Sequence, residues 1–190
     1  MPSRTELLSS SGIFLHAYNR GVDRGPIFFR ESDYRQFITR MAEFLRRSEV
    51  TLLTYTLMPN HFHMLVQQLV PYGISRYLKE VCEGYAKYLN WYRKRSGHLF
   101  QGRYKADDAR DPQGLLHLSH YIHHNPVSAG LVADPAEWKY SSYKDYLHPS
   151  HNGFVDVGVL TNLVGGGERY LEFLKEYDPS DPAGLTDFLI

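Results

Sequence analysis

Hydrophobic and polar residues alternate along the first 110 residues in a pattern that predicts six elements. Apolar residues recur at helical spacing in Glu31–Arg47 and in Ile74–Arg95, which predicts two amphipathic helices. The Pro59-Asn60 pair predicts a turn, so the strands on either side of it should form a hairpin. Runs rich in β-forming residues predict four strands, at Ile13–Asn19, Val50–Met58, His61–Gln68 and Leu99–Asp107.

The order of these elements is β-α-β-β-α-β, which predicts an α+β ferredoxin-like antiparallel sheet with helices on one face. In that topology the third strand lies centrally, beside the first. Further along, Asp111–Asn125 has the pattern of a helix that Pro126 should stop. Short helices are expected at Ser142–Leu147 and Gly167–Tyr177, and they would form an added C-terminal helical region.

The composition is that of a soluble globular protein, with 43% hydrophobic and 22% charged residues. No apolar run has membrane-spanning length and the start lacks a signal-peptide pattern, so we expect a cytoplasmic protein without a membrane partner. A single cysteine, Cys82, excludes a disulfide framework and a cysteine-based zinc site. Net charge is zero, but residues 1–110 carry 17 basic and 10 acidic side chains, which indicates a basic face.

The His61-Phe62-His63 triplet is the first candidate for chemistry. Side chains alternate along a strand, so both imidazoles should lie on one face, where they provide two ligands for a metal ion. Tyr121 and Asn125 are four residues apart and share a helix face, which could bring the Asn125 oxygen to the same ion and Tyr121 one turn away.

Other histidines leave the third ligand open. His117 and His124 lie on the Tyr121 side of the helix or next to it, and either could replace Asn125. His120 and His123 project elsewhere and are expected at the surface.

Five stretches, in the right order and spacing, resemble the single-tyrosine HUH transposases, and most closely the REP-associated tyrosine transposases. They are YNRGVDRGPIF at 18–28, YTLMPNHFHMLV at 55–66, LFQGRYKA at 99–106, YIHHNPVSAGLV at 121–132 and WKYSSYKDYL at 138–147. The resemblance implies a transposase domain at 1–147. Residues 148–190 would be an extension that packs on this domain or binds DNA.

The resemblance also implies an activity, a cofactor and a site. It predicts a single-stranded DNA endonuclease and strand transferase that depends on Mg²⁺ or Mn²⁺ and forms a 5′-phosphotyrosine link at hairpin-forming repeats. By position, Tyr121 would be the nucleophile and His61 and His63 metal ligands. Asn125 takes the third-ligand place, where other branches of the family carry glutamine, and in some relatives the tyrosine helix acts across a homodimer.

The DNA partner should contact the basic first part of the chain. On the expected fourth strand, three polar side chains alternate onto one face, and two arginines follow the first strand. These candidate DNA contacts are Arg20, Arg24, Gln101, Arg103 and Lys105.

Other functions fit parts of the same pattern. A domesticated, non-catalytic protein that binds DNA hairpins would keep the fold without the chemistry. A metal-dependent hydrolase would use the histidines with water as its nucleophile. A replication initiator or relaxase of the wider HUH class would share the histidine pair.

Overall fold

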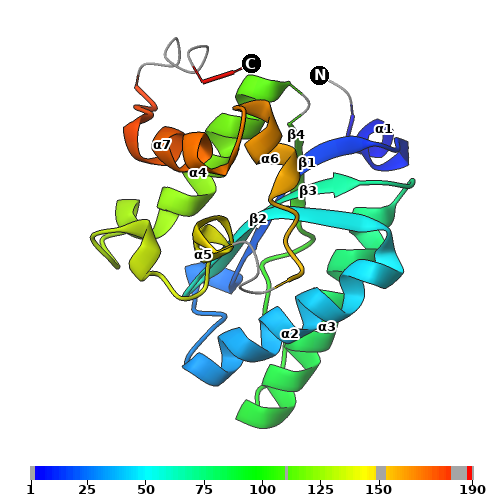
Figure 1. Ribbon diagram of the computed structural model, residues 1–190. Coiled ribbons are helices and arrows are strands. Elements are labelled where there is room, and N and C mark those ends of the chain that lie inside the picture. The colour runs from blue at the N-terminus through cyan, green and yellow to red at the C-terminus, as the bar shows by residue number, and fades with distance from the viewer. Residues whose placement is uncertain (1–2, 110, 149–152, 181–187, 190) are drawn as a thin grey trace.

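A computed structural model describes residues 3–109, 111–148, 153–180 and 188–189, and Figure 1 shows the resulting three layers. A four-stranded antiparallel sheet with the order β2-β3-β1-β4 forms the middle layer. Its strands are β1 Ile13–Arg20, β2 Val50–Met58, β3 His61–Gln68 and β4 Lys105–Asp108. The ferredoxin-like order predicted from the sequence is confirmed, with β3 in a central position beside β1.

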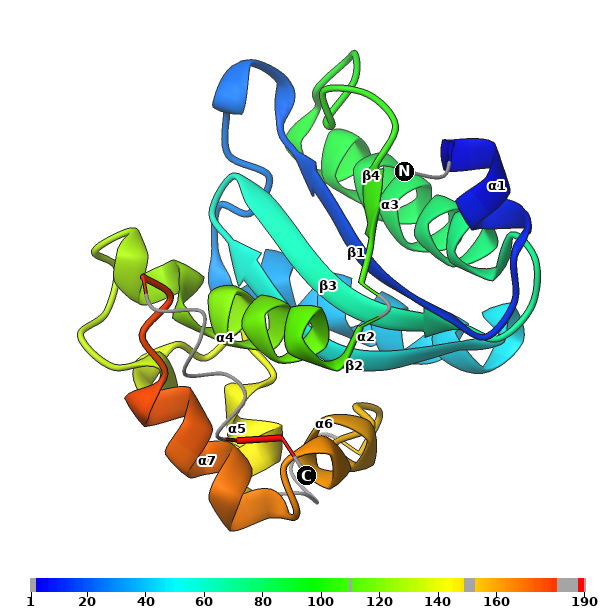
Figure 2. The ribbon, with the colours of Figure 1, turned by 90° about the horizontal axis from the view of Figure 1, so that it is seen from above.

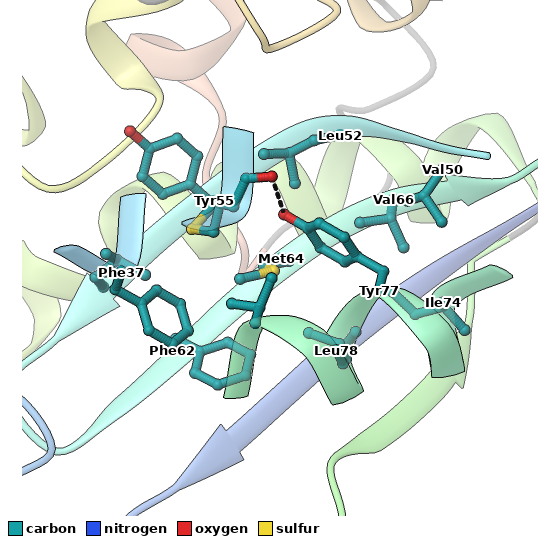
Figure 3. Close-up of a cluster of buried hydrophobic side chains, with 14 of the residues drawn as sticks. Phe37, Val50, Leu52, Tyr55, Phe62, Met64, Val66, Ile74, Tyr77 and Leu78 are labelled. Carbon is teal, nitrogen blue, oxygen red and sulfur yellow. Dashed lines mark hydrogen bonds between the residues drawn. The ribbon is translucent and has the colours of Figure 1, made fainter. Parts of the chain in front are cut away.

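Two long helices, α2 Glu31–Ser48 and α3 Gly73–Arg93, cover one face of the sheet (Figure 1). Their apolar sides meet inward-facing strand residues such as Phe62 and Met64, and Phe37 and Tyr77 are fully buried among them (Figure 3). Burying each such side chain contributes about 1.5–3 kcal/mol, so this cluster is the main core of the fold. The Tyr77 hydroxyl donates to the Met41 carbonyl oxygen at 3.3 Å, which satisfies the one polar group of that ring.

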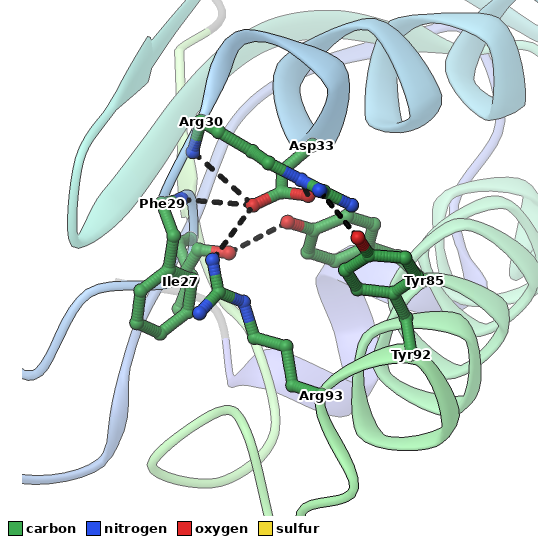
Figure 4. Close-up of polar contacts among 7 residues, drawn as sticks. All are labelled: Ile27, Phe29, Arg30, Asp33, Tyr85, Tyr92 and Arg93. Atoms are coloured by element: carbon green, nitrogen blue, oxygen red, sulfur yellow. Dashed lines mark hydrogen bonds and ion pairs between the residues drawn. The ribbon is translucent and has the colours of Figure 1, made fainter.

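A buried carboxylate joins the start of α2 to the end of α3 (Figure 4). Asp33 is fully buried and accepts hydrogen bonds from the backbone amides of Phe29 and Arg30. The Arg30 and Arg93 guanidinium groups form ion pairs with the same carboxylate, at 3.4 and 3.8 Å. The charge is therefore paired and hydrogen-bonded, as a buried carboxylate requires.

The opposite face of the sheet is covered by α4 Pro112–Ser128, which packs on β2 and β3 (Figure 2). Asp111 caps this helix by accepting from the Gly114 amide at 2.7 Å. The prediction that Pro126 stops the helix is wrong. Proline removes one amide donor, but the Ala129 amide still bonds to the Asn125 carbonyl, so the last turn continues to Ser128.

Shorter helices pack around α4 on this face and form a second core with it (Figure 1). They include the two short helices expected near residues 142–147 and 167–177 and others that the sequence did not reveal. The remaining elements are α1 Arg4–Ser9, η1 Val22–Arg24, η2 Pro135–Glu137, α5 Tyr143–Leu147, α6 Gly158–Leu163 and α7 Gly167–Glu176. Within the described ranges, no helix combines the length and the apolar character needed to cross a bilayer.

The fourth strand is shorter than expected and begins at Lys105 instead of Leu99. Residues 99–101 still follow the end of β1, through bonds from the Val22 amide to the Leu99 carbonyl and from the Gln101 amide to the Arg20 carbonyl. These single bonds do not continue into a ladder, so the segment before Lys105 is a loop held against β1. The predicted extension 148–190 falls partly outside the described residues, and its α6 and α7 pack in the second core.

Candidate active site

Strand alternation places the two histidines of β3 on the face that α4 covers. Phe62 and Met64 point into the main core, so His61 and His63 point the other way. The centroids of the two imidazole rings are 5.0 Å apart. His63 is buried and His61 is half-buried, which puts the pair at the border between the second core and solvent.

The β2–β3 turn fixes which nitrogen of His61 is free. The Asn60 side-chain amide donates to the Arg24 carbonyl at 3.0 Å, which turns its Oδ1 toward His61 Nδ1, 2.7 Å away. Because an amide oxygen only accepts, His61 Nδ1 must carry the proton. His61 Nε2 therefore has a lone pair, and it faces α4.

Asn125 of α4 meets that lone pair. Its Oδ1 atom lies 3.2 Å from His61 Nε2. Two electron-pair donors that face one another at this distance suit a cation between them. Within the part of the chain that the structure describes, no three His, Cys, Asp or Glu side chains are grouped to hold an ion, so a metal bound here needs the Asn125 amide.

Tyr121 lies one helical turn before Asn125, with its ring edge-on to His63. The ring centroids are 5.3 Å apart and the planes are inclined at 80°. The side chain is 43% exposed, so the phenol is accessible from solvent while its ring rests on the histidine pair. The structure thus brings Tyr121, Asn125, His61 and His63 into one group.

Burial keeps the imidazoles of this group neutral. The pKa of His63 falls to about 3, because burial and then the neighbouring His16 and His61 rings disfavour a positive charge. Burial also lowers the pKa of His61, and the contact with Asn125 opposes that effect. Neutral rings present lone pairs at neutral pH, which is the form that binds a metal.

The other histidines of α4 point away from this group. His117 Nδ1 lies 2.8 Å from the Tyr177 hydroxyl, and His124 Nδ1 lies 3.1 Å from the His120 carbonyl. The expectation that His120 and His123 lie at the surface is wrong, since they are 6% and 0% exposed. The second core covers the side of α4 that the sequence alone suggested would face solvent.

The five candidate DNA contacts line one hollow of about 610 Å³ together with His61 and His63. Two loops shape it. The Gly21 amide donates to the Asn60 carbonyl at 2.8 Å, and a Cβ atom on Gly21 would lie 2.1 Å from the Gly25 carbonyl oxygen, so this turn requires glycine. On the other side, Asn19 Nδ2 donates to the Gly102 carbonyl at 3.0 Å. The contacts that this hollow brings together are Arg20, Arg24, Gln101, Arg103 and Lys105.

One member of the group was missed in the sequence. His16 of β1 is buried, and its Nε2 lies 2.9 Å from His63 Nδ1. Burial lowers the pKa of His16 to about 4, and the carboxylate of Asp107 only partly offsets this. A signal was present, because Leu15 and Ala17 mark the core side of the first strand and leave His16 on the other. The register that sets it beside His63 was not readable from the sequence.

Comparison with known proteins gives the chain a family. Among solved structures, one described as "Structure of the REP associates tyrosine transposase bound to a REP hairpin" is similar to this chain. The TM-score is 0.64 at 16% identity, over 78% of this chain and 86% of that one, which shows a shared fold. No curated protein gives a significant match. The family model described as "Transposase IS200 like" matches residues 9–125, more than half of the chain, and the protein therefore belongs to the IS200-like transposases.

Proposed function

We propose that the protein is a metal-dependent single-stranded DNA endonuclease and strand transferase that forms a 5′-phosphotyrosine intermediate. One observation carries the proposal. The solvent-accessible Tyr121 lies edge-on to His63, while Asn125 Oδ1 lies 3.2 Å from the unprotonated nitrogen of His61. A phenol beside an anchored cation site is the arrangement that nucleophilic attack on a phosphodiester needs.

His61 Nε2, His63 Nε2 and Asn125 Oδ1 would hold the ion, Mg²⁺ or Mn²⁺. When bound, it would supply Lewis-acid charge to the scissile phosphate. The chain contributes the fixed positions of the ligands, since two of them come from the central strand of the sheet and the third from the helix that also carries Tyr121.

The reaction at Tyr121 is a phosphoryl transfer without net hydrolysis. The phenol oxygen forms a bond to phosphorus, the bond between phosphorus and the 3′ oxygen breaks, and the proton lost by the phenol ends on the released 3′-hydroxyl. The reverse reaction with another 3′-hydroxyl rejoins DNA strands. Each phosphodiester exchanged is replaced by a phosphotyrosine ester, so no external energy source is needed.

The basic hollow beside the histidines would hold the DNA. Arginine and lysine contacts to phosphate supply affinity, and the arginines of this hollow lie on both sides of the histidine pair. The similar solved protein is bound to a REP hairpin, and we propose hairpin-forming repeats as the DNA partner here as well. All the side chains named come from one chain, so the proposal does not require a second copy.

The test uses single-stranded DNA from the repeats that flank the gene, labelled at its 3′ end so that the fragment bound to tyrosine carries the label. The protein is incubated with this DNA and Mg²⁺ or Mn²⁺, and the products are separated under denaturing conditions. Tyr121→Phe removes only the attacking oxygen. Tyr72→Phe is the matched control, because Tyr72 is 46% exposed and lies at the start of α3, outside the histidine group.

We expect a labelled protein–DNA species with the wild type and with Tyr72→Phe, and its complete loss with Tyr121→Phe or EDTA. Free product without a protein adduct would contradict the proposal and favour a hydrolase. DNA binding without any cleavage would contradict it as well and favour the non-catalytic hairpin binder.

A further inference from the structure

His16 makes a direct contact with the back of the proposed metal ligand His63. Antiparallel pairing sets β1 beside β3, and both side chains point to the α4 face. The atoms His16 Nε2 and His63 Nδ1 are 2.9 Å apart, and the two rings are stacked with centroids 5.1 Å apart and planes inclined at 19°. His16 is only 7% exposed, so water does not compete freely for this contact.

The contact constrains where His63 carries its proton. Both rings are neutral, so one of the two facing nitrogens donates and the other accepts. If His63 Nδ1 donates, the proton is on Nδ1, and Nε2 keeps the lone pair that a metal needs. If His16 Nε2 donates instead, His63 Nδ1 is the acceptor and His63 Nε2 carries a hydrogen, which excludes it as a ligand.

The surroundings of His16 favour the first arrangement. Asp107 of β4 is the partner of His16 in the β1–β4 ladder, and its negative charge acts on the His16 ring. A negative charge stabilises an N–H group directed to it. His16 Nε2 already faces His63, so Nδ1 is the nitrogen left to carry that hydrogen. His16 Nε2 then has a lone pair and accepts from His63.

We propose that His16 is a positioning residue that holds His63 with its proton on Nδ1 and thereby presents Nε2 to the metal. The proposal rests on the proposed function for its purpose, since it assigns His63 Nε2 to an ion. Metal-bound histidines generally donate their second ring N–H to such a partner, and loss of the partner typically weakens metal binding about 10–100-fold.

The experiment compares two substitutions that differ in one property. His16→Gln offers an amide oxygen that can accept from His63 Nδ1, whereas His16→Leu has similar bulk and no acceptor. Protons on ring nitrogens are located by long-range ¹H–¹⁵N correlation NMR of ¹⁵N-histidine-labelled protein without metal or DNA. Mn²⁺ affinity is measured separately by EPR titration. His98→Leu, at an exposed position, is the control for loss of a histidine.

We expect His63 to carry its proton on Nδ1 in the wild type and in His16→Gln. His16→Leu should populate the Nε2–H form and bind Mn²⁺ about 10–100-fold more weakly. His16→Gln and His98→Leu should stay within a few-fold of the wild type. If His63 carries its proton on Nε2 in the metal-free wild type, or if His16→Gln and His16→Leu bind Mn²⁺ equally, the proposal is overturned.

The two readouts separate this proposal from the proposed function. The NMR measurement involves neither metal nor DNA, so it reports on His63 whether or not the protein cleaves DNA. A protein with the expected proton position and no tyrosine adduct would refute only the nuclease. A protein that forms the adduct with the opposite proton position would refute only the role of His16.

Discussion

Acid should destabilise this protein through His123, the most deeply buried histidine of α4. Its side chain is fully buried between the rings of Tyr143 and Tyr146, and its Nε2 lies 2.9 Å from Ser142 Oγ. His123 Nδ1 has no hydrogen-bond partner among the described residues. Protonation would place an unpaired charge in the second core, and burial accordingly lowers the pKa of His123 to about 3, with smaller effects from His124 and His120.

The size of the effect follows from proton linkage. In the unfolded chain the pKa of a histidine is about 6.5, so the unfolded state takes up a proton between pH 6.5 and 3 that the folded state does not. The stability associated with the neutral buried ring is therefore fully present above pH 6.5 and is lost as the pH falls toward 3. At about 1.36 kcal/mol per pH unit, the loss at pH 5 is about 2 kcal/mol for this side chain. A typical domain has only about 5–15 kcal/mol in total.

The assay is urea unfolding at pH 7.5 and pH 5.0, with the wild type and His123→Gln. Glutamine can keep the N–H donor toward Ser142 Oγ but does not titrate, so it removes the linkage and preserves the contact. Stability should fall between the two pH values by about 2 kcal/mol more in the wild type than in the variant. Other buried histidines contribute equally to both proteins and cancel in this difference.

His148→Gln is the matched control, because His148 is exposed, and it should show the same pH dependence as the wild type. Equal losses in the wild type and His123→Gln would refute the reasoning, since they would mean that His123 is not held neutral by burial. The outcome also bears on the active site, because His123 anchors the helix that carries Tyr121 two residues earlier.

Two further predictions concern charge elsewhere in the molecule. Asp33→Ala should reduce the free energy of unfolding by about 3–5 kcal/mol in a denaturant titration, because it leaves two guanidinium groups and two amides without their buried partner; a loss below 1 kcal/mol would show that this carboxylate contributes little. In the proposed DNA complex, changing both Arg103 and Lys105 to Gln should reduce the slope of log affinity against log salt by about 1.4, whereas the exposed pair Arg46 and Arg47 on α2 serves as a control that should leave it unchanged. An unchanged slope for the first pair would remove these residues from the DNA contacts.

The elements that the sequence predicted well are those in which local pattern and packing agree. The second and third strands were predicted with the bounds that the structure has, since their β-forming residues are interrupted only by the Pro59-Asn60 turn. The same alternation correctly placed His61 and His63 together on one face. Leu99–Tyr104 alternates in the same way, yet its backbone bonds run to the end of β1 and the loop after it, and this difference depends on contacts distant in sequence.

The sequence failed where one element is covered on two sides. The apolar pattern of α4 cannot show that the sheet covers one side and α5, α6 and α7 cover another, so His120 and His123 looked like surface residues. His16 was missed for a related reason. Its parity along the strand was readable, but its contact with His63 depends on the pairing register of two strands about 47 residues apart.

The two halves of the candidate site are therefore held by different parts of the fold. His61 and His63 lie on a central strand whose position is fixed by strands on both sides and by the main core. Tyr121 and Asn125 lie on a helix that meets the sheet near the polar histidine group, while its apolar contacts are made largely with the C-terminal helices. Residues such as Leu160 and Phe173, which contact no member of the site, pack in the core that holds this helix. The distance between the phenol and the imidazole pair thus depends on the packing of residues 143–177 against α4, and the C-terminal region is part of what positions the nucleophile.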